Sequence, residues 1–542
     1  MKIALAQLNI HVGNFEANTE KIIRAIQTAE QLGAELLVCS ELAVCGYPAR
    51  DFLEFDDFIN RCESSLLRIA AAATKLAVLV GAPMKNPERD GKDLYNCAYF
   101  LADGAVQQVV RKTLLPTYDV FDEYRYFEPN TVFECVAWKG RKLAVTICED
   151  IWNIGNENPL YTICPMDQLI QQQPDVMINL SASPFNYRQH EVRNDVISAN
   201  CKRYQLPMVY VNQVGAQTEL IFDGDSRVMS ASGELLAQLP MFEERVTTVD
   251  LEQELSVAST PQGETERIFN ALVLGIRDYF AKLGFKKAVL GLSGGIDSAV
   301  VLCLAAAALG RENVLSVLLP SGYSSGHSVD DSLALVNNLQ SPHEIIPIES
   351  TYQSFLHTLQ PIFKDLPFSV AEENLQARVR GTLLMALSNK FGYILLNTTN
   401  KSEAAVGYGT LYGDMCGGLA VLGDVYKMQV YALAHYINRS SEIIPNHIIT
   451  KAPSAELRPG QKDSDSLPDY ALLDQLLYQY IEQRQGPREL EQQGFEPALV
   501  QRVLKMVNGN EWKRFQAPPI LRVSQKAFGM GRRMNIEGKY LG

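Results

Sequence analysis

The chain has 542 residues, of which 47% are hydrophobic and 20% are charged, and its formal net charge is −13. This composition supplies apolar surface for more than one buried core, excludes a disordered chain, and argues against a general nucleic-acid binder, which needs a basic face for phosphates. The chain has ten cysteines but no CxxC pair, which predicts a reduced, cytoplasmic protein. Its apolar runs are all shorter than the roughly 20 residues that cross a bilayer, so we expect neither membrane nor, given the acidic charge, nucleic-acid partners.

Short apolar runs, each ended by polar, Gly or Pro residues, recur through the first 248 residues. Such runs are typical of strands buried on both faces, and they lie at 3–8, 36–40, 77–81, 143–148, 176–180 and 208–211. A helical pattern at 18–32 separates the first two runs, whereas the runs at 97–101 and 106–110 flank Asp103-Gly104 as in a hairpin. The mixture predicts an α/β sandwich with a substantially antiparallel sheet.

The pattern changes near residues 249–264, where polar residues interrupt the apolar periodicity. We place a linker there, between a first domain at 1–248 and a second domain at 265–542. The second domain begins with a helix at 265–283, and strands and helices then alternate. Strands are expected at 288–292, 314–319, 345–348 and 393–397, and helices at 298–308, 329–339 and 375–389. This alternation predicts βαβ crossovers and a doubly wound parallel sheet.

The strongest local signal of the second domain is the string GLSGGIDS at 291–298, between an apolar strand and an apolar helix. Glycines let the backbone approach phosphate oxygens, and the helix N-terminus adds free N–H groups and a favourable dipole. The string lacks the lysine of a Walker A loop. It resembles instead the pyrophosphate loop of the ATP pyrophosphatases, which adenylate a carboxylate or carbonyl and release pyrophosphate. The residues expected to hold ATP are Gly291, Ser293, Gly294, Gly295, Asp297 and Ser298, with Asp297 also a ligand of Mg²⁺.

Further strings at 373–380, 397–403, 407–414, 422–427 and 451–470 resemble those of NAD synthetases and occur in the same order. The string at 397–403 follows a predicted strand, at the sheet edge where open α/β folds bind ligands. The resemblance implies that Thr398 contacts ATP and that Glu403 helps to bind Mg²⁺. The residues that it implies for deamido-NAD binding are Asn374, Arg378, Glu403, Asp414, Lys451 and Ser454.

Three segments of the first domain, 39–47, 111–116 and 145–152, place charged or nucleophilic residues at the ends of buried strands. Unpaired charges there would be costly, so Glu41, Lys112 and Cys148 are expected to converge. A thiol that attacks an amide needs a carboxylate to move its proton and a positive charge to stabilise the oxyanion. Glu41 would be the base and acid, Cys148 the nucleophile, and Lys112 the stabilising charge, which also favours the thiolate.

These segments resemble the Glu-Lys-Cys triad of the nitrilase, or carbon–nitrogen hydrolase, family in order and spacing. The resemblance implies a nitrilase-like α-β-β-α sandwich with glutaminase activity, in which Glu123 is a second, orienting glutamate. The residues that it implies for glutamine binding are Tyr118, Glu123, Ser181, Ser183 and Arg188.

Taken together, the two halves resemble glutamine-dependent NAD synthetases over almost the full length. The resemblance implies that glutamine-derived ammonia, ATP and deamido-NAD react with Mg²⁺ to give NAD, AMP and pyrophosphate, in a homo-oligomer that encloses a path for ammonia. Three alternatives stay open: a synthetase fed by free ammonia, another adenylating amidotransferase acting on a different carboxylate or nucleotide, and a nucleotide-sensing scaffold without turnover. The chain from about residue 471 onward carries no recognisable motif.

Overall fold

The computed structural model describes residues 1–88, 90–154, 160–252, 262–324 and 326–540. The chain forms two compact units, Met1–Pro261 and Gln262–Gly542. Strand β14 (Arg245–Asp250) is the last described element of the first unit, and helix α5 (Glu264–Leu283) is the first of the second. The linker proposed at 249–264 spans this interval, of which residues 253–261 lie outside the described residues.

The first unit contains two six-stranded sheets, each mixed in direction. Their strand orders are β14-β1-β2-β3-β4-β5 and β13-β12-β9-β8-β7-β6, and β10 pairs with β11 in a separate hairpin. In each sheet the central pairs are parallel and the outer pairs are antiparallel. The strands are β1 (Lys2–Gln7), β2 (Leu36–Val38), β3 (Ala77–Lys85), β4 (Leu94–Ala102), β5 (Ala105–Arg111), β6 (Val136–Trp138), β7 (Arg141–Ile147), β8 (Val176–Ser181), β9 (Met208–Asn212), β10 (Val214–Gln217), β11 (Leu220–Asp223), β12 (Arg227–Met229) and β13 (Leu235–Gln238).

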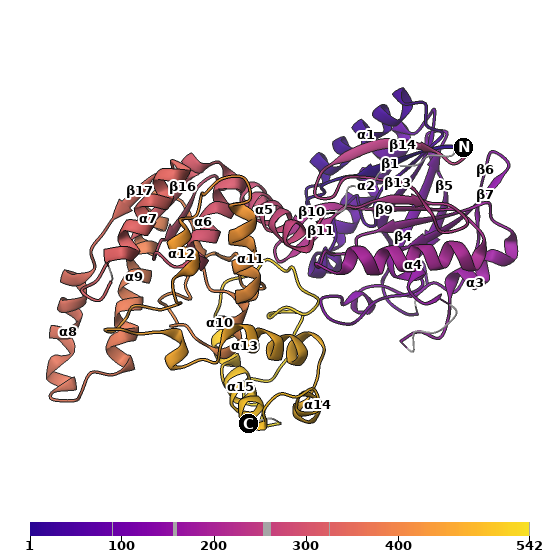
Figure 1. The fold of residues 1–542 in the computed structure, drawn as a ribbon. Helices are drawn as coiled ribbons and strands as arrows, with labels where there is room; N and C mark the ends of the chain where they lie inside the picture. The colour runs from indigo at the N-terminus through magenta and orange to yellow at the C-terminus, as the bar shows by residue number, and fades with distance from the viewer. Residues whose placement is uncertain (89, 155–159, 253–261, 325, 541–542) are drawn as a thin grey trace. The chain divides into compact units, whose positions relative to one another are not determined.

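Helices cover the outer face of each sheet, so the unit is a four-layer α-β-β-α sandwich, as expected (Figure 1). These helices are α1 (Phe15–Gln31) and α2 (Asp56–Ala72) on the first sheet, and α3 (Pro165–Leu169) and α4 (Gln189–Tyr204) on the second. One apolar core fills the space between the sheets, and one lies under each helical layer. Strand β1 serves two cores because its side chains alternate: Ile3 and Leu5 face the other sheet, whereas Ala4 and Ala6 face the helices.

The strands expected from apolar runs in the first unit are present, and so is the hairpin of β4 and β5. Helix α1 begins at Phe15 rather than at the predicted residue 18, because the side chain of Asn14 caps it by accepting the Ala17 N–H. The predicted strand at 143–148 is one residue too long. Strand β7 ends at Ile147, and Cys148 begins the 3₁₀ turn η3 (Cys148–Ile151).

The second unit is built on a five-stranded sheet with the order β17-β16-β15-β18-β19. All neighbouring strands are parallel, and the chain order reverses at β15, which confirms the doubly wound parallel sheet. The strands are β15 (Ala288–Gly291), β16 (Val314–Leu318), β17 (His343–Ile345), β18 (Ile394–Asn397) and β19 (Leu419–Ala420). The carboxyl ends of β15 and β18 flank the reversal, the place where open α/β sheets bind ligands.

The four helices expected in the second unit are present as α5, α6, α7 and α9, and further helices follow. Beyond α5 they are α6 (Ile296–Leu309), α7 (Gly326–Leu339), α8 (Glu349–Phe363), α9 (Val370–Phe391), α10 (Lys401–Val406), α11 (Lys427–Ile437), α12 (Asn446–Thr450), α13 (Tyr470–Leu477), α14 (Pro487–Gln492), α15 (Pro497–Gly509) and α16 (Glu511–Arg514). The strand predicted at 345–348 was wrong in position. Strand β17 ends at Ile345, because Ile348 is already the N-cap of α8 and packs into the core.

The C-terminal helices α13 and α15 form a core of their own, which also takes in Ala405 and Val406 of α10. The end of the chain, in which the sequence shows no motif, therefore packs against α10, the helix that includes the end of the 397–403 segment. Within the described ranges, none of the helices combines the length and the apolarity that crossing a membrane requires.

Candidate functional site

Glu41, Lys112 and Cys148 each follow the carboxyl end of a strand of the first unit, namely β2, β5 and β7. The Lys112 Nζ lies 2.7 Å from Glu41 Oε1 and 2.7 Å from Glu123 Oε2. Glu41 and Lys112 are fully buried, whereas Cys148 keeps 5% of its surface exposed. The nucleophile candidate is therefore the least buried member of this triad.

Hydrogen bonds from neighbouring groups, among them Asn96, which donates to both carboxylates, hold the two glutamates in place. The Asn96 side chain donates to Glu41 Oε1 at 2.7 Å, and the Ala182 N–H donates to Glu41 Oε2 at 3.1 Å. The Tyr47 hydroxyl donates to Glu123 Oε1 at 3.0 Å. Neither Asn96 nor Tyr47 was predicted as a site residue, because Asn96 lies in an ordinary apolar strand and Tyr47 reaches Glu123 only through the fold.

Burial and charge oppose each other in this group. Burial alone would lower the pKa of Lys112, but the carboxylates of Glu123 and Glu41 outweigh it, and the pKa rises well above its usual value. Burial raises the pKa of Glu123 to about 7, with the charge of Glu41 acting in the same direction and that of Lys112 against it. Lys112 is therefore an ammonium at neutral pH, clamped between two carboxyl groups.

Cys148 has a positive φ of 43°, a backbone region that residues with a side chain seldom occupy. Such strain is often found where a side chain must be aimed at a substrate. Burial raises the pKa of the thiol well above its usual value, and Glu41 adds to this, whereas Lys112 lowers it. Lys112 thus acts on the thiolate in the predicted direction without deciding the outcome: the resting group is a thiol, and a base must take its proton during attack.

The residues expected to bind glutamine lie on three segments. Tyr118 is 41% exposed, and its hydroxyl donates to Glu149 Oε1 at 2.9 Å, beside Cys148. Ser181 ends strand β8, and the Ser183 N–H donates to the Asn212 side chain at 2.9 Å. Arg188 is the exposed N-cap residue of α4.

Glu149 was missed as a candidate, although it stands in the string that identified Cys148. Its carboxylate also accepts a hydrogen bond of 2.8 Å from the Tyr161 hydroxyl. Burial raises the pKa of Glu149 against the lowering effect of Tyr161. A buried carboxylate adjacent to the nucleophile is suited to an ammonium group of a substrate.

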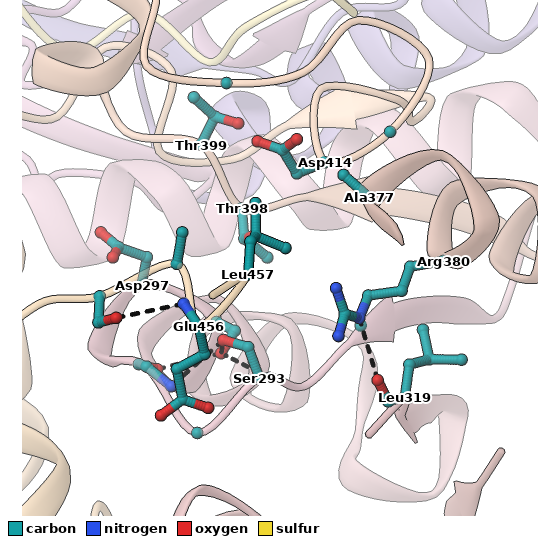
Figure 2. A pocket seen from close by; sticks show the side chains of 18 of the residues that line it. Ser293, Asp297, Leu319, Ala377, Arg380, Thr398, Thr399, Asp414, Glu456 and Leu457 are labelled. Atoms are coloured by element: carbon teal, nitrogen blue, oxygen red, sulfur yellow. Dashed lines mark hydrogen bonds between the residues drawn. The ribbon is translucent and has the colours of Figure 1, made fainter. Parts of the chain in front are cut away.

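The second unit contains a cavity of about 490 Å³ at the carboxyl ends of β15 and β18 (Figure 2). It is lined by nearly all residues that the sequence assigned to this half: Gly291, Ser293, Gly294, Gly295, Asp297, Ser298, Asn374, Thr398, Glu403, Asp414, Lys451 and Ser454. Strings separated by more than 100 residues in the sequence therefore meet in one space large enough for a nucleotide.

The string at 291–298 forms a tight turn from β15 into α6. Gly294 has a φ of 77°, and a Cβ at this position would lie 2.5 Å from the Ser328 carbonyl oxygen, so only glycine fits. Gly295 is the N-cap of α6 and donates its N–H to Ser293 Oγ at 3.2 Å. The turn brings the N-terminus of an apolar 14-residue helix to the cavity wall, which favours bound phosphate.

Carboxylates outnumber the cation beside this turn. The Lys427 Nζ lies 2.5 Å from Asp297 Oδ2 and 3.4 Å from Glu403 Oε1. Burial raises the pKa of Glu403 to about 8, Asp297 adds to this, Lys427 lowers it, and Asp463 raises it further. The part of the chain that the structure describes contains no cluster of three or more His, Cys, Asp or Glu side chains arranged for a metal. Two carboxylates beside the N-terminus of α6 nevertheless fit Mg²⁺, which commonly takes one or two carboxylates and completes its shell with phosphate oxygens and water.

Arg378 does not line the cavity, and Arg380 does (Figure 2). The Arg378 Nε donates to the Leu411 carbonyl at 3.2 Å, whereas the Arg380 Nε donates to the Leu319 carbonyl at 3.0 Å. Both residues belong to α9, and side chains two positions apart on a helix point roughly 200° apart. The sequence at 373–380 contains both arginines, and the direction in which each side chain leaves the helix determines which one lines the cavity.

Lys451 and Ser454 belong to the 451–462 segment, which borders the same cavity. The Lys451 Nζ lies 2.9 Å from Glu456 Oε1 and also donates to the Ser328 hydroxyl. The Ser454 hydroxyl donates to the Gln461 carbonyl at 2.6 Å. Lys451 thus stands at the rim with its charge already matched by a carboxylate of its own segment.

The C-terminal part of the chain holds α10 and reaches the cavity. The buried Lys401 Nζ lies 2.9 Å from Asp424 Oδ1 and 3.0 Å from Glu482 Oε1. The Lys513 Nζ donates to the carbonyls of Gly407 and Gly409 at 2.8 and 3.0 Å, and Lys513 lines the cavity. Lys513 lies in no motif that the sequence revealed, so only the fold identifies it.

Comparisons with known proteins agree with this two-part arrangement. The carbon–nitrogen hydrolase family model matches residues 2–260, and the NAD synthase family model matches residues 268–517. The chain is 47% identical to the glutamine-dependent NAD(+) synthetase of Synechocystis sp., over 98% of each sequence.

Two solved structures match nearly the whole chain. The glutamine-dependent NAD+ synthetase from Acinetobacter baumannii, solved in complex with ADP, has a TM-score of 0.79 at 39% identity and covers 99% of this chain and 98% of its own. The glutamine-dependent NAD(+) synthetase from Cytophaga hutchinsonii has a TM-score of 0.84 at 20% identity over 99% and 97% of the two chains, which supports the fold. The chain therefore belongs to the family of glutamine-dependent NAD(+) synthetases, as a carbon–nitrogen hydrolase unit followed by an NAD synthase unit.

Proposed function

We propose that this chain makes NAD from deamido-NAD and ATP, with ammonia that it releases from glutamine. The observation that carries the proposal is the buried Lys112 ammonium held between Glu41 and Glu123, close enough to the Cys148 thiol to lower its pKa. This arrangement suits amide hydrolysis and would be costly to keep without a use, because buried charges rarely repay their desolvation. It favours glutamine as the nitrogen source over free ammonia alone.

In the first unit, the Cys148 thiol attacks the side-chain amide carbon of glutamine while Glu41 takes the thiol proton. Lys112 stabilises the charge on the amide oxygen, and Glu41 returns the proton to the departing ammonia. Water then hydrolyses the thioester and releases glutamate. The carboxylate of Glu149, which accepts a hydrogen bond of 2.9 Å from Tyr118, would hold the α-ammonium group of glutamine, and Ser181, Ser183 and Arg188 would bind the rest of the substrate.

In the second unit, the turn at 291–298 holds the ATP phosphates, and Thr398 contacts the nucleotide. The carboxylate of deamido-NAD attacks the α-phosphate, pyrophosphate leaves, and ammonia displaces AMP from the mixed anhydride. Asp297 and Glu403 would hold Mg²⁺, which supplies charge neutralisation at the leaving pyrophosphate. Asn374, Asp414, Lys451 and Ser454, which line the same cavity, would bind deamido-NAD.

The same proposal includes the cellular setting. Most ammonia in bulk water at neutral pH is protonated, and only the small unprotonated fraction can attack, so we propose an enclosed path that delivers ammonia to the second reaction, in a homo-oligomer. All ten cysteines are free thiols, which supports a reducing compartment such as the cytoplasm.

The test is a nitrogen-source panel with purified protein, ATP, Mg²⁺ and deamido-NAD, supplied with either glutamine or ammonium, in which NAD and AMP are measured. A Cys148→Ala variant is expected to lose glutamine-supported synthesis and to keep ammonium-supported synthesis. Cys135→Ala is the matched control, because this thiol lies in the same unit, donates to the Leu169 carbonyl and has no proposed role. Glutamine-supported synthesis that persists in Cys148→Ala would refute the first-unit mechanism. AMP without NAD would point to a different acceptor.

A further inference from the structure

Asp150 is 3% exposed, and its carboxylate accepts three hydrogen bonds from backbone N–H groups. Its Oδ1 accepts the N–H groups of Thr113 at 3.0 Å and Leu114 at 2.8 Å. Its Oδ2 accepts the N–H group of Ile147 at 3.0 Å. One oxygen therefore binds the residues that follow Lys112, and the other binds the residue that precedes Cys148.

These two segments belong to different sheets. Lys112 follows β5, an edge strand of the first sheet, whereas Cys148 follows β7 of the second sheet. The space between the sheets is filled by apolar side chains, and apolar contacts are not directional. Directional bonds across the sheets therefore help to fix the position of Lys112 relative to Cys148: the Ala182 N–H after β8 donates to Glu41, which pairs with Lys112, and Asp150 binds the backbone of both segments directly.

Hydrogen bonds are directional, and those to a carboxylate are stronger than neutral ones. The carboxylate of Asp150 spans the two sheets at the point where both catalytic side chains emerge. Burial raises the pKa of Asp150 to about 6, while the N–H groups of Leu114 and Ile147 lower it, so the carboxylate is ionised at neutral pH. Oδ1 accepts two backbone N–H groups and Oδ2 accepts one, so the carboxylate is held by the backbone of both segments.

We propose that Asp150 is the positioning residue that sets the distance between the Lys112 ammonium and the Cys148 thiol by linking the two sheets. This proposal rests on the glutaminase function of the first unit proposed above. It assigns Asp150 a role in turnover through Lys112 and Cys148, beyond a contribution to stability.

Asp150→Asn is the sharpest variant, because it preserves shape and removes one acceptor. If the amide oxygen keeps Thr113 and Leu114, the amide NH₂ faces the Ile147 N–H, and one half of the link is replaced by two opposed donors. The matched control is Asp175→Asn. The Asp175 Oδ2 also accepts a backbone N–H of strand β7, that of Lys142 at 2.7 Å, but at the end of the strand away from Cys148.

Three measurements separate positioning from folding: kcat and KM for glutamine hydrolysis, the rate of Cys148 alkylation by iodoacetamide, and ammonium-supported NAD formation. In Asp150→Asn we expect kcat for glutamine to fall about 100-fold, the loss typical of a misplacement near 1 Å, with KM changed by less than about threefold, since the glutamine-binding residues are not linked by Asp150. The alkylation rate should change with it, whereas ammonium-supported synthesis should stay near that of the unmodified protein. Asp175→Asn should match the unmodified protein in all three.

A kcat for glutamine within threefold of the unmodified protein in Asp150→Asn would overturn the proposal, provided that Cys148→Ala is inactive with glutamine. If Cys148→Ala keeps its glutamine activity, the proposed glutaminase mechanism has failed instead. Asp150→Ala, which removes all three acceptor contacts, should lose at least as much kcat as Asp150→Asn. If neither variant folds in its first unit, Asp150 serves stability and the positioning role is wrong.

Discussion

Removing the charge of Lys112 tests whether the clamped ammonium offsets the two carboxyl groups. Lys112→Met keeps the length of the side chain and leaves Glu41 and Glu123 buried without their cation, each having lost a contact of 2.7 Å. Breaking a buried ion pair from one side typically costs about 3–5 kcal/mol. We therefore expect the first unit to lose about 3–5 kcal/mol of unfolding free energy, together with its glutamine hydrolysis.

The sign of the pH dependence follows from Glu123. Its pKa is raised to about 7 in the folded unit, so the folded state holds a proton that the unfolded state releases, and Glu123 costs stability as pH rises from about 4.5 through 7. Without Lys112 this pKa rises further, so the unpaired carboxylate is penalised most at high pH. The destabilisation of Lys112→Met should thus be larger at pH 8 than at pH 6.

Urea denaturation followed by tryptophan fluorescence measures this loss in one unit. Trp138 and Trp152 lie in the first unit, and Trp512 lies in the second and is 45% exposed. In a Trp512→Phe background the fluorescence therefore comes from the first unit alone, and replacing this exposed side chain should change the stability of the second unit little. The control is Lys75→Met, whose exposed pairing with Glu30 spans 3.4 Å and should contribute less than about 1 kcal/mol. A loss below about 1 kcal/mol at pH 8 in Lys112→Met, or one that grows as pH falls, would refute the electrostatic account.

Three further predictions concern the second unit. Gly294→Ala should slow NAD formation about 10- to 100-fold with either nitrogen source and spare glutamine hydrolysis, because its Cβ would meet the Ser328 backbone, whereas Gly326→Ala, with open space around it, should change neither rate. Binding of Mg²⁺ with ATP should release a proton below pH 8, since a cation lowers the Glu403 pKa from about 8; calorimetry in two buffers of different ionisation enthalpy measures this, and equal release from Glu403→Gln would contradict it. Lys401→Met should cost the unit about 3–5 kcal/mol in urea unfolding reported by Trp512, and an unchanged midpoint would show that its buried contacts do not hold α10.

Short stretches of the sequence were enough to predict several elements of the fold and several candidate site residues. The turn at 291–298 was readable because phosphate binding needs glycines and a helix N-terminus in consecutive positions, and these requirements are met within eight residues. The strands ending near Glu41, Lys112 and Cys148 were readable because burial on both faces demands continuous apolar runs. The family resemblance added that distant motifs occur in the same order as in the family, and the matches to both family models support this.

Other features depended on neighbours that are distant in the sequence. Asn96 and Tyr47 bind the glutamates from separate strands and loops. Arg380 rather than Arg378 lines the cavity of the second unit because of the direction of one helix face. Lys513 enters that cavity from a segment without a motif.

The protonation state of the Cys148 thiol is the clearest example of a property that the sequence by itself did not determine. A lysine near a thiol lowers the thiol pKa, and that much follows from residue types. Burial and Glu41 act in the opposite direction and prevail. Desolvation depends on how many atoms from every layer surround the sulfur, and this quantity exists only after the two sheets have packed together.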